Sequence, residues 1–316
     1  MLIEIYPVII LDEESPEKLE YNEYLQQMRT NPQAKNGLGQ FFVSKSGDKL
    51  YYRVWHSEDP KRILLGIHGM AAHGEYYVQV ADQLISDNIT TYALDLKQHG
   101  KSSGKKGDLK DFKTLIEQVN EFILFLKDKH ENLPIFLMGL SMGGCVGANF
   151  GIMYPENING IILMAPAVKA GYKVSFSDIL KLLGLIFVYI FARGKPIVDI
   201  AKRNKGLGTR NPLRKKYDEN DEYRIKKVSI RYLLQLGKWV KKAFKNASKI
   251  SCPVLIVQGT TDKLVSPEGV KEFFNCLITK DKNFIELEGA YHCLFSDSAM
   301  IEQGGWNAIK DWILAH

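Results

Sequence analysis

The chain contains a serine, Ser141, between two glycines at a junction predicted to join a strand to a helix. The apolar run Ile135–Met138 before it is typical of a buried strand, and Met142–Tyr154 after it is predicted to be helical. A sharp turn of this kind has no room for side chains two residues before and two residues after the serine, and Gly139 and Gly143 stand there. The pattern predicts a nucleophile elbow, in which the serine hydroxyl stands exposed above the sheet.

Apolar runs and helical stretches alternate along most of the chain. The runs predicted to be buried strands are Ile63–Ile67, Thr90–Leu94, Ile135–Met138, Ile161–Met164, Val254–Val257 and Phe284–Leu287. The stretches predicted to be helices are Glu75–Asp87, Phe112–Lys129, Met142–Tyr154, Pro267–Ile278 and Gln303–Leu314. A hairpin is expected from Phe41–Ser44 and Leu50–Trp55. This alternation predicts an α/β fold with a mainly parallel sheet covered by helices on both faces.

The alternation is interrupted between residues 169 and 249, where the charge is also unusual. The whole chain has a net charge of only +6, but residues 169–249 contain 21 Lys and Arg against 6 Asp and Glu. Within this segment Leu182–Ala192 is a run without charge, shorter than the roughly 20 residues that span a bilayer. We interpret the segment as an insertion over the strand ends, where open α/β sheets bind ligands. A buried helix packed on the core is the alternative for Leu182–Ala192.

The 316 residues suit one large domain with this insertion. We predict a core of residues 39–168 and 250–316, a cap (lid) of residues 169–249, and an N-terminal extension of residues 1–38 without an assigned role. The four cysteines are scattered, and the first residues lack the basic start and cleavage site of a signal peptide. Free thiols and a cytoplasmic location are therefore expected.

Two later loops contain the partners that a serine nucleophile needs. Asp262 follows the predicted strand Val254–Val257, and His292 follows Phe284–Leu287. A serine becomes a strong nucleophile when a base takes its proton and a third group fixes the tautomer of that base. We predict that Ser141 is the nucleophile, His292 the acid/base and Asp262 the orienting acid. Taken singly, the aspartate would be a turn or capping residue and the histidine a surface-loop residue.

Attack on an ester carbonyl places negative charge on oxygen, which backbone amides stabilise. The predicted donors of this oxyanion hole are the amides of Met142 and Met70. Met70 follows Gly69, which lets the backbone approach the site closely. Cys293, next to His292, is interpreted as a bystander thiol.

Other chemistries find little support in the sequence. His68 and His73 lack the intervening glutamate of a zinc motif, and Asp95 stands where a phosphate-binding loop ending in Gly100–Ser102 requires glycine. We therefore expect no metal and no cofactor. The basic segment has no accompanying nucleic-acid recognition motif, so a nucleic-acid partner is not expected.

These residues together resemble the α/β-hydrolase superfamily, and within it the monoacylglycerol lipase and lysophospholipase branch. The resemblance covers residue 39 to the C-terminus and rests on the segments His68–Met70, Asp95–Ser102, Gly139–Gly144, Gly259–Asp262 and Tyr291–His292. Gln98 replaces the first glycine of the family loop Asp-x-x-Gly-His-Gly-x-Ser. The resemblance implies that His68 contributes its backbone rather than its side chain. The resemblance implies an α/β-hydrolase fold: a mostly parallel eight-stranded sheet, helices on both faces and an inserted, mainly helical cap.

The same resemblance implies hydrolysis of carboxylic esters of single-chain lipids through an acyl-enzyme. Monoacylglycerol lipase activity, which yields fatty acid and glycerol, is the leading hypothesis. A lysophospholipase or a general short-chain carboxylesterase is the alternative, and an aminopeptidase is disfavoured because no acidic pocket for a free amine is evident. A ligand-binding relative without catalysis is the non-enzyme alternative.

An apolar run beside clustered lysines and arginines is typical of segments that rest on anionic lipid. Our hypothesis is that the cap docks peripherally on the inner membrane face and lets a fatty-acyl ester reach Ser141.

Overall fold

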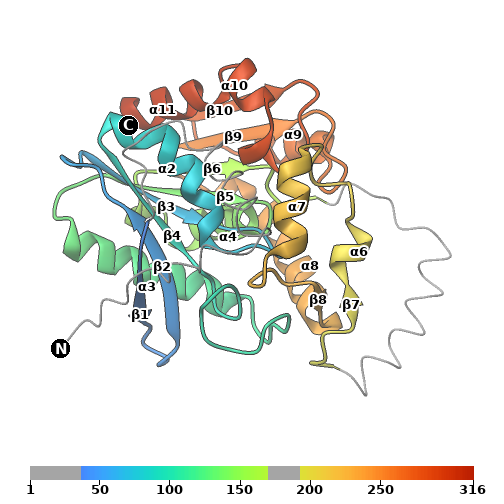
Figure 1. Cartoon of the computed structure of the whole chain (residues 1–316). Helices are drawn as coiled ribbons and strands as arrows, with labels where there is room; N and C mark the ends of the chain where they lie inside the picture. The colour runs from blue at the N-terminus through green and yellow to red at the C-terminus, as the bar shows by residue number, and fades with distance from the viewer. Residues whose placement is uncertain (1–36, 170–192) are drawn as a thin grey trace, which may run out of the picture.

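A computed structural model of the chain describes residues 37–169 and 193–316, and its centre is an eight-stranded sheet (Figure 1). The strands are β1 (Leu38–Val43), β2 (Lys49–Trp55), β3 (Arg62–Ile67), β4 (Ile89–Leu94), β5 (Ile135–Leu140), β6 (Gly160–Met164), β9 (Val254–Gly259) and β10 (Lys282–Leu287). Their order is β1-β2-β4-β3-β5-β6-β9-β10. β2 pairs antiparallel with both β1 and β4, and every other pairing is parallel. The predicted mostly parallel sheet and hairpin are confirmed.

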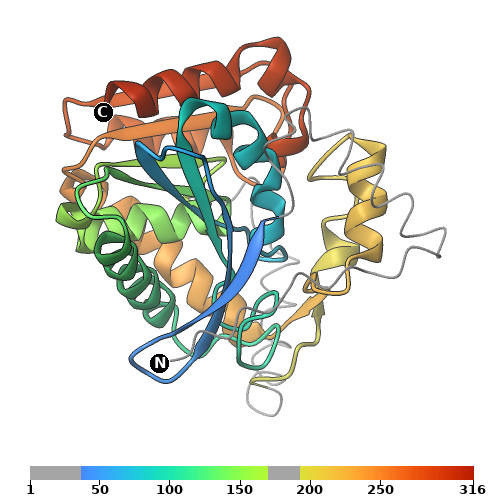
Figure 2. The same cartoon turned by 60° about the vertical axis from the view of Figure 1, so that its left-hand side comes forward.

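Helices cover both faces of this sheet, as predicted. The helices of the core are η1 (Gly74–Tyr77), α2 (Val78–Leu84), η2 (Ile85–Asp87), α3 (Lys113–Lys129), α4 (Met142–Met153), η3 (Pro155–Asn157), α9 (Pro267–Asn275), η5 (Leu294–Ser296), α10 (Ala299–Glu302) and α11 (Gly305–Ala315). Helices α3, α4 and α9 contribute to one buried cluster, and α2, α10 and α11 contribute to a second one. The two views place these groups on opposite sides of the sheet (Figures 1 and 2).

The alternation of side chains along each strand explains why the strands are apolar throughout. In β5, Ile135 and Leu137 belong to the cluster with α3 and α4, whereas Phe136 and Met138 belong to the cluster with α2 and α11. Both faces are buried, so successive residues must all be apolar. This is the physical origin of the uninterrupted runs in the sequence.

Three predicted helices differ from the structure by more than one residue. The stretch Pro267–Ile278 ends three residues early, at Asn275. The stretch Glu75–Asp87 is divided into η1, α2 and η2 rather than forming one helix. The stretch Gln303–Leu314 begins late, because Gly304 has a φ of 70° and ends α10 before α11 starts. A left-handed residue cannot continue a right-handed helix, so the predicted helix was wrong at its first two positions.

The chain leaves the core after β6 and returns at β9, which is adjacent to β6 in the sheet. The described part of the intervening segment contains β7 (Val198–Asp199), α6 (Ile200–Arg203), α7 (Pro212–Asn220), β8 (Lys227–Val228), α8 (Ile230–Lys245) and η4 (Ala247–Lys249). Leu182–Ala192 lies outside the described residues, as do residues 1–36. Among the residues described, no helix is both long and apolar enough to cross a membrane.

Residues 193–249 form hydrogen bonds to loops at the carboxyl ends of the parallel strands. Ile225 N–H donates to the Ala71 carbonyl after β3 at 3.0 Å, and Ser229 N–H donates to the Gly107 carbonyl after β4 at 2.7 Å. Beyond β10, Cys293 N–H donates to the Gly208 carbonyl at 2.8 Å. These contacts support the predicted place of the cap, while the division of the chain into core, cap and extension stays a prediction.

Hydrogen bonds and ion pairs between buried side chains connect α7 to η1. His73 Nε2 lies 2.9 Å from Asp221 Oδ2, and the Tyr76 hydroxyl donates to both Asp221 and Asp218 at 2.9 Å. Arg214 Nε donates to Asp218 Oδ1 at 2.9 Å. Burial disfavours the charged imidazole, but the hydrogen bond and charge of Asp221 raise the pKa of His73 above its ordinary value. The cluster therefore joins the cap segment to the core by paired charges, which is the form in which buried charge is tolerated.

Candidate active site

Ser141 lies in the predicted turn between β5 and α4. Its φ of 57° and ψ of −114° fall in a region that non-glycine residues rarely adopt. The strained backbone is held by Ser141 N–H, which donates to the Met164 carbonyl at 2.9 Å, and by the Ser141 carbonyl, which accepts from Cys145 N–H at 3.0 Å. Strain that the surrounding structure enforces is typical of functional positions.

Close backbone approach explains the two glycines beside this turn. A Cβ atom on Gly139 would overlap the carbonyl of Gly143, and a Cβ atom on Gly143 would overlap the carbonyl of Ile67 in β3. Both obstacles are backbone atoms, which a rotamer change cannot move aside. The strand–turn–helix geometry thus accounts for the glycine spacing from which it was predicted.

The predicted acid and base lie in direct contact. Asp262 follows β9, His292 follows β10, and Asp262 Oδ2 lies 2.7 Å from His292 Nδ1. The other carboxylate oxygen, Oδ1, accepts from Leu264 N–H at 2.8 Å and Val265 N–H at 3.0 Å. Burial alone would raise the pKa of Asp262, but the charge and hydrogen bond of His292 and the two amides lower it below its ordinary value. The carboxylate therefore stays ionised and fixes the imidazole.

Ser141 lies at the same edge of the sheet, because β5, β9 and β10 run parallel and all three residues follow their carboxyl ends. In the described part of the chain, no hydrogen bond joins Ser141 Oγ to the His292 ring, so the structure links two of the three predicted residues directly. Catalytic hydrogen bonds are often long before substrate binds and shorten in the reacting complex.

The loop after β3 approaches Ser141 closely at Gly69. A Cβ atom at Gly69 would lie 3.5 Å from Ser141 Cβ and 4.0 Å from Ser141 Oγ. Met70 follows directly, and Met142 is the first residue of α4, so its amide belongs to a helix N-terminus. The two predicted oxyanion-hole donors thus come from two segments that meet beside the serine.

The side chain of His68 has a role that the sequence analysis missed. Its Nδ1 lies 2.8 Å from the Gly69 carbonyl, and its Nε2 accepts from Leu96 N–H at 3.0 Å. Desolvation by burial lowers the pKa of His68 well below its ordinary value, so the ring is neutral. The expectation that His68 contributes only its backbone was wrong, because the ring orients the loop that carries Met70.

One further buried residue, Gln258, contacts the predicted acid and was missed by the sequence analysis. Gln258, the penultimate residue of β9, donates from Nε2 to Asp262 Oδ2 at 3.2 Å. In the loop after β4, Gln98 has a φ of 71°, a conformation that glycine adopts more readily. The family glycine that Gln98 replaces therefore stands at a position where the backbone is left-handed.

Cys293 is a poor candidate for a nucleophile. Desolvation by burial raises the pKa of its thiol, so the reactive thiolate is disfavoured at neutral pH.

Within residues 37–169 and 193–316, no group of three or more His, Cys, Asp or Glu side chains is placed to hold a metal ion.

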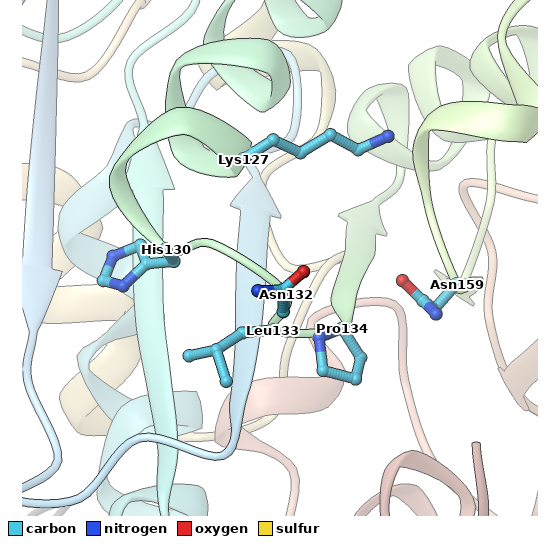
Figure 3. Close-up of a pocket in the computed structure, with 6 residues that line it drawn as sticks. All are labelled: Lys127, His130, Asn132, Leu133, Pro134 and Asn159. Carbon is cyan, nitrogen blue, oxygen red and sulfur yellow. The ribbon is translucent and has the colours of Figure 1, made fainter.

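An open hollow of about 290 Å³ lies away from this site (Figure 3). It is lined by Lys127, His130, Asn132, Leu133, Pro134 and Asn159. These residues surround the amino end of β5, whereas Ser141 follows its carboxyl end. The hollow and the predicted triad are therefore at opposite ends of one strand.

A mostly parallel eight-stranded sheet, a strained serine at a strand–helix turn and a buried Asp–His pair at neighbouring strand ends define the α/β-hydrolase class. Residues 58–299 match the model of a hydrolase family described as "Serine aminopeptidase, S33", and the chain belongs to this family.

Known relatives show which branch of the family this chain is most similar to among those compared. The chain is 25% identical to the monoglyceride lipase of Homo sapiens over 284 residues, covering 86% of this chain and 88% of that protein. It is 29% identical to a phospholipase of Bacillus subtilis over 249 residues, covering 77% and 92%. The crystal structure of the Paleococcus ferrophilus monoacylglycerol lipase superposes with a TM-score of 0.71 at 27% identity, covering 84% and 99%. The resemblance to the monoacylglycerol lipase branch of the α/β-hydrolases is confirmed.

Proposed function

We propose that this hydrolase cleaves carboxylic esters of single-chain lipids, with monoacylglycerols as preferred substrates, through an acyl-enzyme on Ser141. The observation that carries the proposal is the 2.7 Å contact between Asp262 and His292 at the sheet edge where the strained Ser141 stands. A carboxylate that orients an imidazole beside a serine is the arrangement that makes the hydroxyl nucleophilic.

In the proposed mechanism His292 Nε2 removes the hydroxyl proton while Ser141 Oγ attacks the ester carbonyl carbon. The negative charge that develops on the carbonyl oxygen is stabilised by the amides of Met70 and Met142. Collapse of this intermediate expels the alcohol, which takes the proton from His292. Water activated by His292 then attacks the acyl-enzyme and releases the fatty acid.

The choice of a lipid ester is supported by the relatives, which include monoglyceride lipases and a phospholipase. The phospholipase keeps lysophospholipids open as an alternative substrate class. The family description also names an aminopeptidase, but the carboxylate identified at the candidate site, Asp262, is paired with His292 and is therefore not available to bind a substrate amine.

A substrate panel tests the proposal. We expect kcat/KM for a monoacylglycerol to exceed that for di- and triacylglycerols and for lysophosphatidylcholine by about ten-fold or more, with Ser141→Ala as the blank. Preference for lysophosphatidylcholine, for short-chain nitrophenyl esters or for amino-acid nitroanilides would replace the proposal by a lysophospholipase, a carboxylesterase or an aminopeptidase. Absence of both turnover and fluorophosphonate labelling would indicate a non-catalytic relative.

We also propose that the cap contacts the anionic lipid of the inner membrane face, because its described residues are strongly basic. Residues 193–249 contain 18 Lys and Arg against 5 Asp and Glu. Lys226 and Lys227 are exposed, and Lys227 is the first residue of β8. Each lysine near an anionic surface contributes about 1 kcal/mol to binding.

The membrane proposal predicts a charge-dependent affinity. Replacing Lys226 and Lys227 by glutamate should weaken binding to phosphatidylserine-containing vesicles by about 30-fold or more in a sedimentation assay. The matched control replaces Lys127 and Lys129, exposed on α3 at the far end of the sheet, and should bind as the wild type does. Equal binding to neutral and anionic vesicles, or equal loss in both variants, would refute the cap as the contact surface.

A further inference from the structure

A tyrosine of the cap segment extends to the oxyanion-hole loops. Tyr232 is fully buried in the first turn of α8, where its N–H donates to the capping Ser229 Oγ at 3.0 Å. Its hydroxyl donates to Met142 Sδ at 3.0 Å and lies 2.9 Å from His99 Nε2. One hydroxyl therefore contacts the residue after the predicted nucleophile and a histidine of the loop after β4.

His99 extends this connection to the other predicted donor. The same Nε2 atom lies 3.0 Å from the Met70 carbonyl, and Nδ1 lies 3.0 Å from the Lys97 carbonyl. Desolvation by burial lowers the pKa of His99 to about 4, so the ring carries a single proton at neutral pH. We assign this proton to Nε2, where it is shared between the Met70 carbonyl and the Tyr232 oxygen, while the Tyr232 proton points to Met142 Sδ. In this tautomer Nδ1 contacts the Lys97 carbonyl without donating a hydrogen bond.

These contacts complete the support of the Met70 backbone. His68 holds the Gly69 carbonyl, and the planar peptide then fixes the direction of the Met70 N–H on the opposite side. His99 holds the next carbonyl, that of Met70 itself. The two peptide groups that flank Met70 are thus each held by a buried histidine ring.

We propose that Tyr232 and His99 are positioning residues that hold the Met70 and Met142 amides in the orientation that catalysis needs. Through these two residues, the orientation of the amides depends on how the cap packs against the core. The proposal rests on the proposed function, because it assigns the two amides to the oxyanion hole. Donors that stabilise a transition state must be placed to within a fraction of an ångström. Tyr232 is inaccessible to solvent, so water does not readily replace its hydroxyl when it is removed.

The test compares two buried tyrosines. Tyr232→Phe should lower kcat for the preferred ester by about ten-fold and leave KM within about two-fold, because the oxyanion forms only in the transition state. The matched control is Tyr92→Phe. The Tyr92 hydroxyl also lies against a histidine, 2.7 Å from His130 Nε2, but at the far end of the sheet. This control loses a similar hydrogen bond and should keep the wild-type kcat.

A second measurement distinguishes a change in the orientation of the oxyanion-hole amides from a general loss of stability. A trifluoromethyl ketone forms a tetrahedral adduct with serine that needs the oxyanion hole, so its affinity should fall in Tyr232→Phe by about the same factor as kcat/KM. In a double-mutant cycle with Met142→Leu, which keeps the backbone amide and removes the sulfur acceptor, the two losses should be less than additive.

Each outcome is decisive. A kcat within two-fold of wild type in Tyr232→Phe, or parallel losses of kcat and Tm in Tyr232→Phe and Tyr92→Phe, would overturn the positioning role while leaving the proposed function intact. A wild-type protein that neither turns over esters nor reacts with a fluorophosphonate would instead remove the proposed function, and the positioning role with it.

Discussion

Replacing Ser141 by alanine is expected to abolish ester hydrolysis, with a fall in kcat of about a million-fold. Alanine removes the only atom that can form the acyl-enzyme, while the backbone at a φ of 57° and the helix that follows keep their surroundings. The thermal unfolding midpoint should therefore change little. Steady-state hydrolysis and labelling by a fluorophosphonate probe, followed by intact mass, measure both parts of the prediction.

A nearby serine provides the control for this experiment. Ser296 Oγ donates to the Cys293 carbonyl at 3.2 Å in the loop that carries His292, so it is close in the chain but bonded elsewhere. Ser296→Ala should react with the probe and hydrolyse ester nearly as the wild type does. If labelling persisted in Ser141→Ala and were lost in Ser296→Ala, the assignment of Ser141 as the nucleophile would be wrong.

Replacing Asp262 by asparagine is expected to lower kcat by about four orders of magnitude without unfolding the protein. The amides of Leu264 and Val265 both donate to Oδ1, so the asparagine oxygen will remain there. Its NH₂ group then faces His292 Nδ1 in place of the carboxylate. Because NH₂ is a donor, the imidazole must turn its lone pair toward it and carry its proton on Nε2, the atom that should accept the serine proton.

Asp297 offers a matched carboxylate. Its two oxygens accept from the amides of Tyr291 and Ala299, at 2.8 and 3.2 Å, in the same loop region. Asp297→Asn should keep kcat within a few-fold of wild type, since this residue does not touch the imidazole in the structure. If Asp262→Asn retained more than a tenth of the wild-type kcat, the orienting role of Asp262 would be wrong.

The parts of the site that follow from local patterns could be predicted from sequence. Ser141 was located by glycines whose backbone crowding the structure explains, and Asp262 and His292 by their places after apolar runs. Strands buried on both faces leave a strong signal because every residue must be apolar. The residues that follow parallel strands then have to gather at one edge, which makes their convergence predictable.

The supporting contacts could not be predicted in this way. Tyr232 and Met142 are 90 residues apart, and Tyr232 and His99 are 133 apart, with no periodic pattern joining them. Gln98 and Gly304 take left-handed conformations, and only the glycine is of a type that signals it. Such contacts depend on how the cap segment packs against the core, which is a property of the whole fold rather than of any short window.

The adjacency of β6 and β9 has a consequence for how such an enzyme can diversify. The intervening segment begins and ends at neighbouring strands, so its two junctions lie close together whatever its length or sequence. Insertions, deletions or complete exchange of this segment can remodel the entrance to the site while the scaffold of the chemistry is inherited unchanged. Substrate selectivity and catalytic chemistry can therefore evolve independently. Contacts such as that of Tyr232 are the exception, because a change in the cap there also affects the catalytic loops.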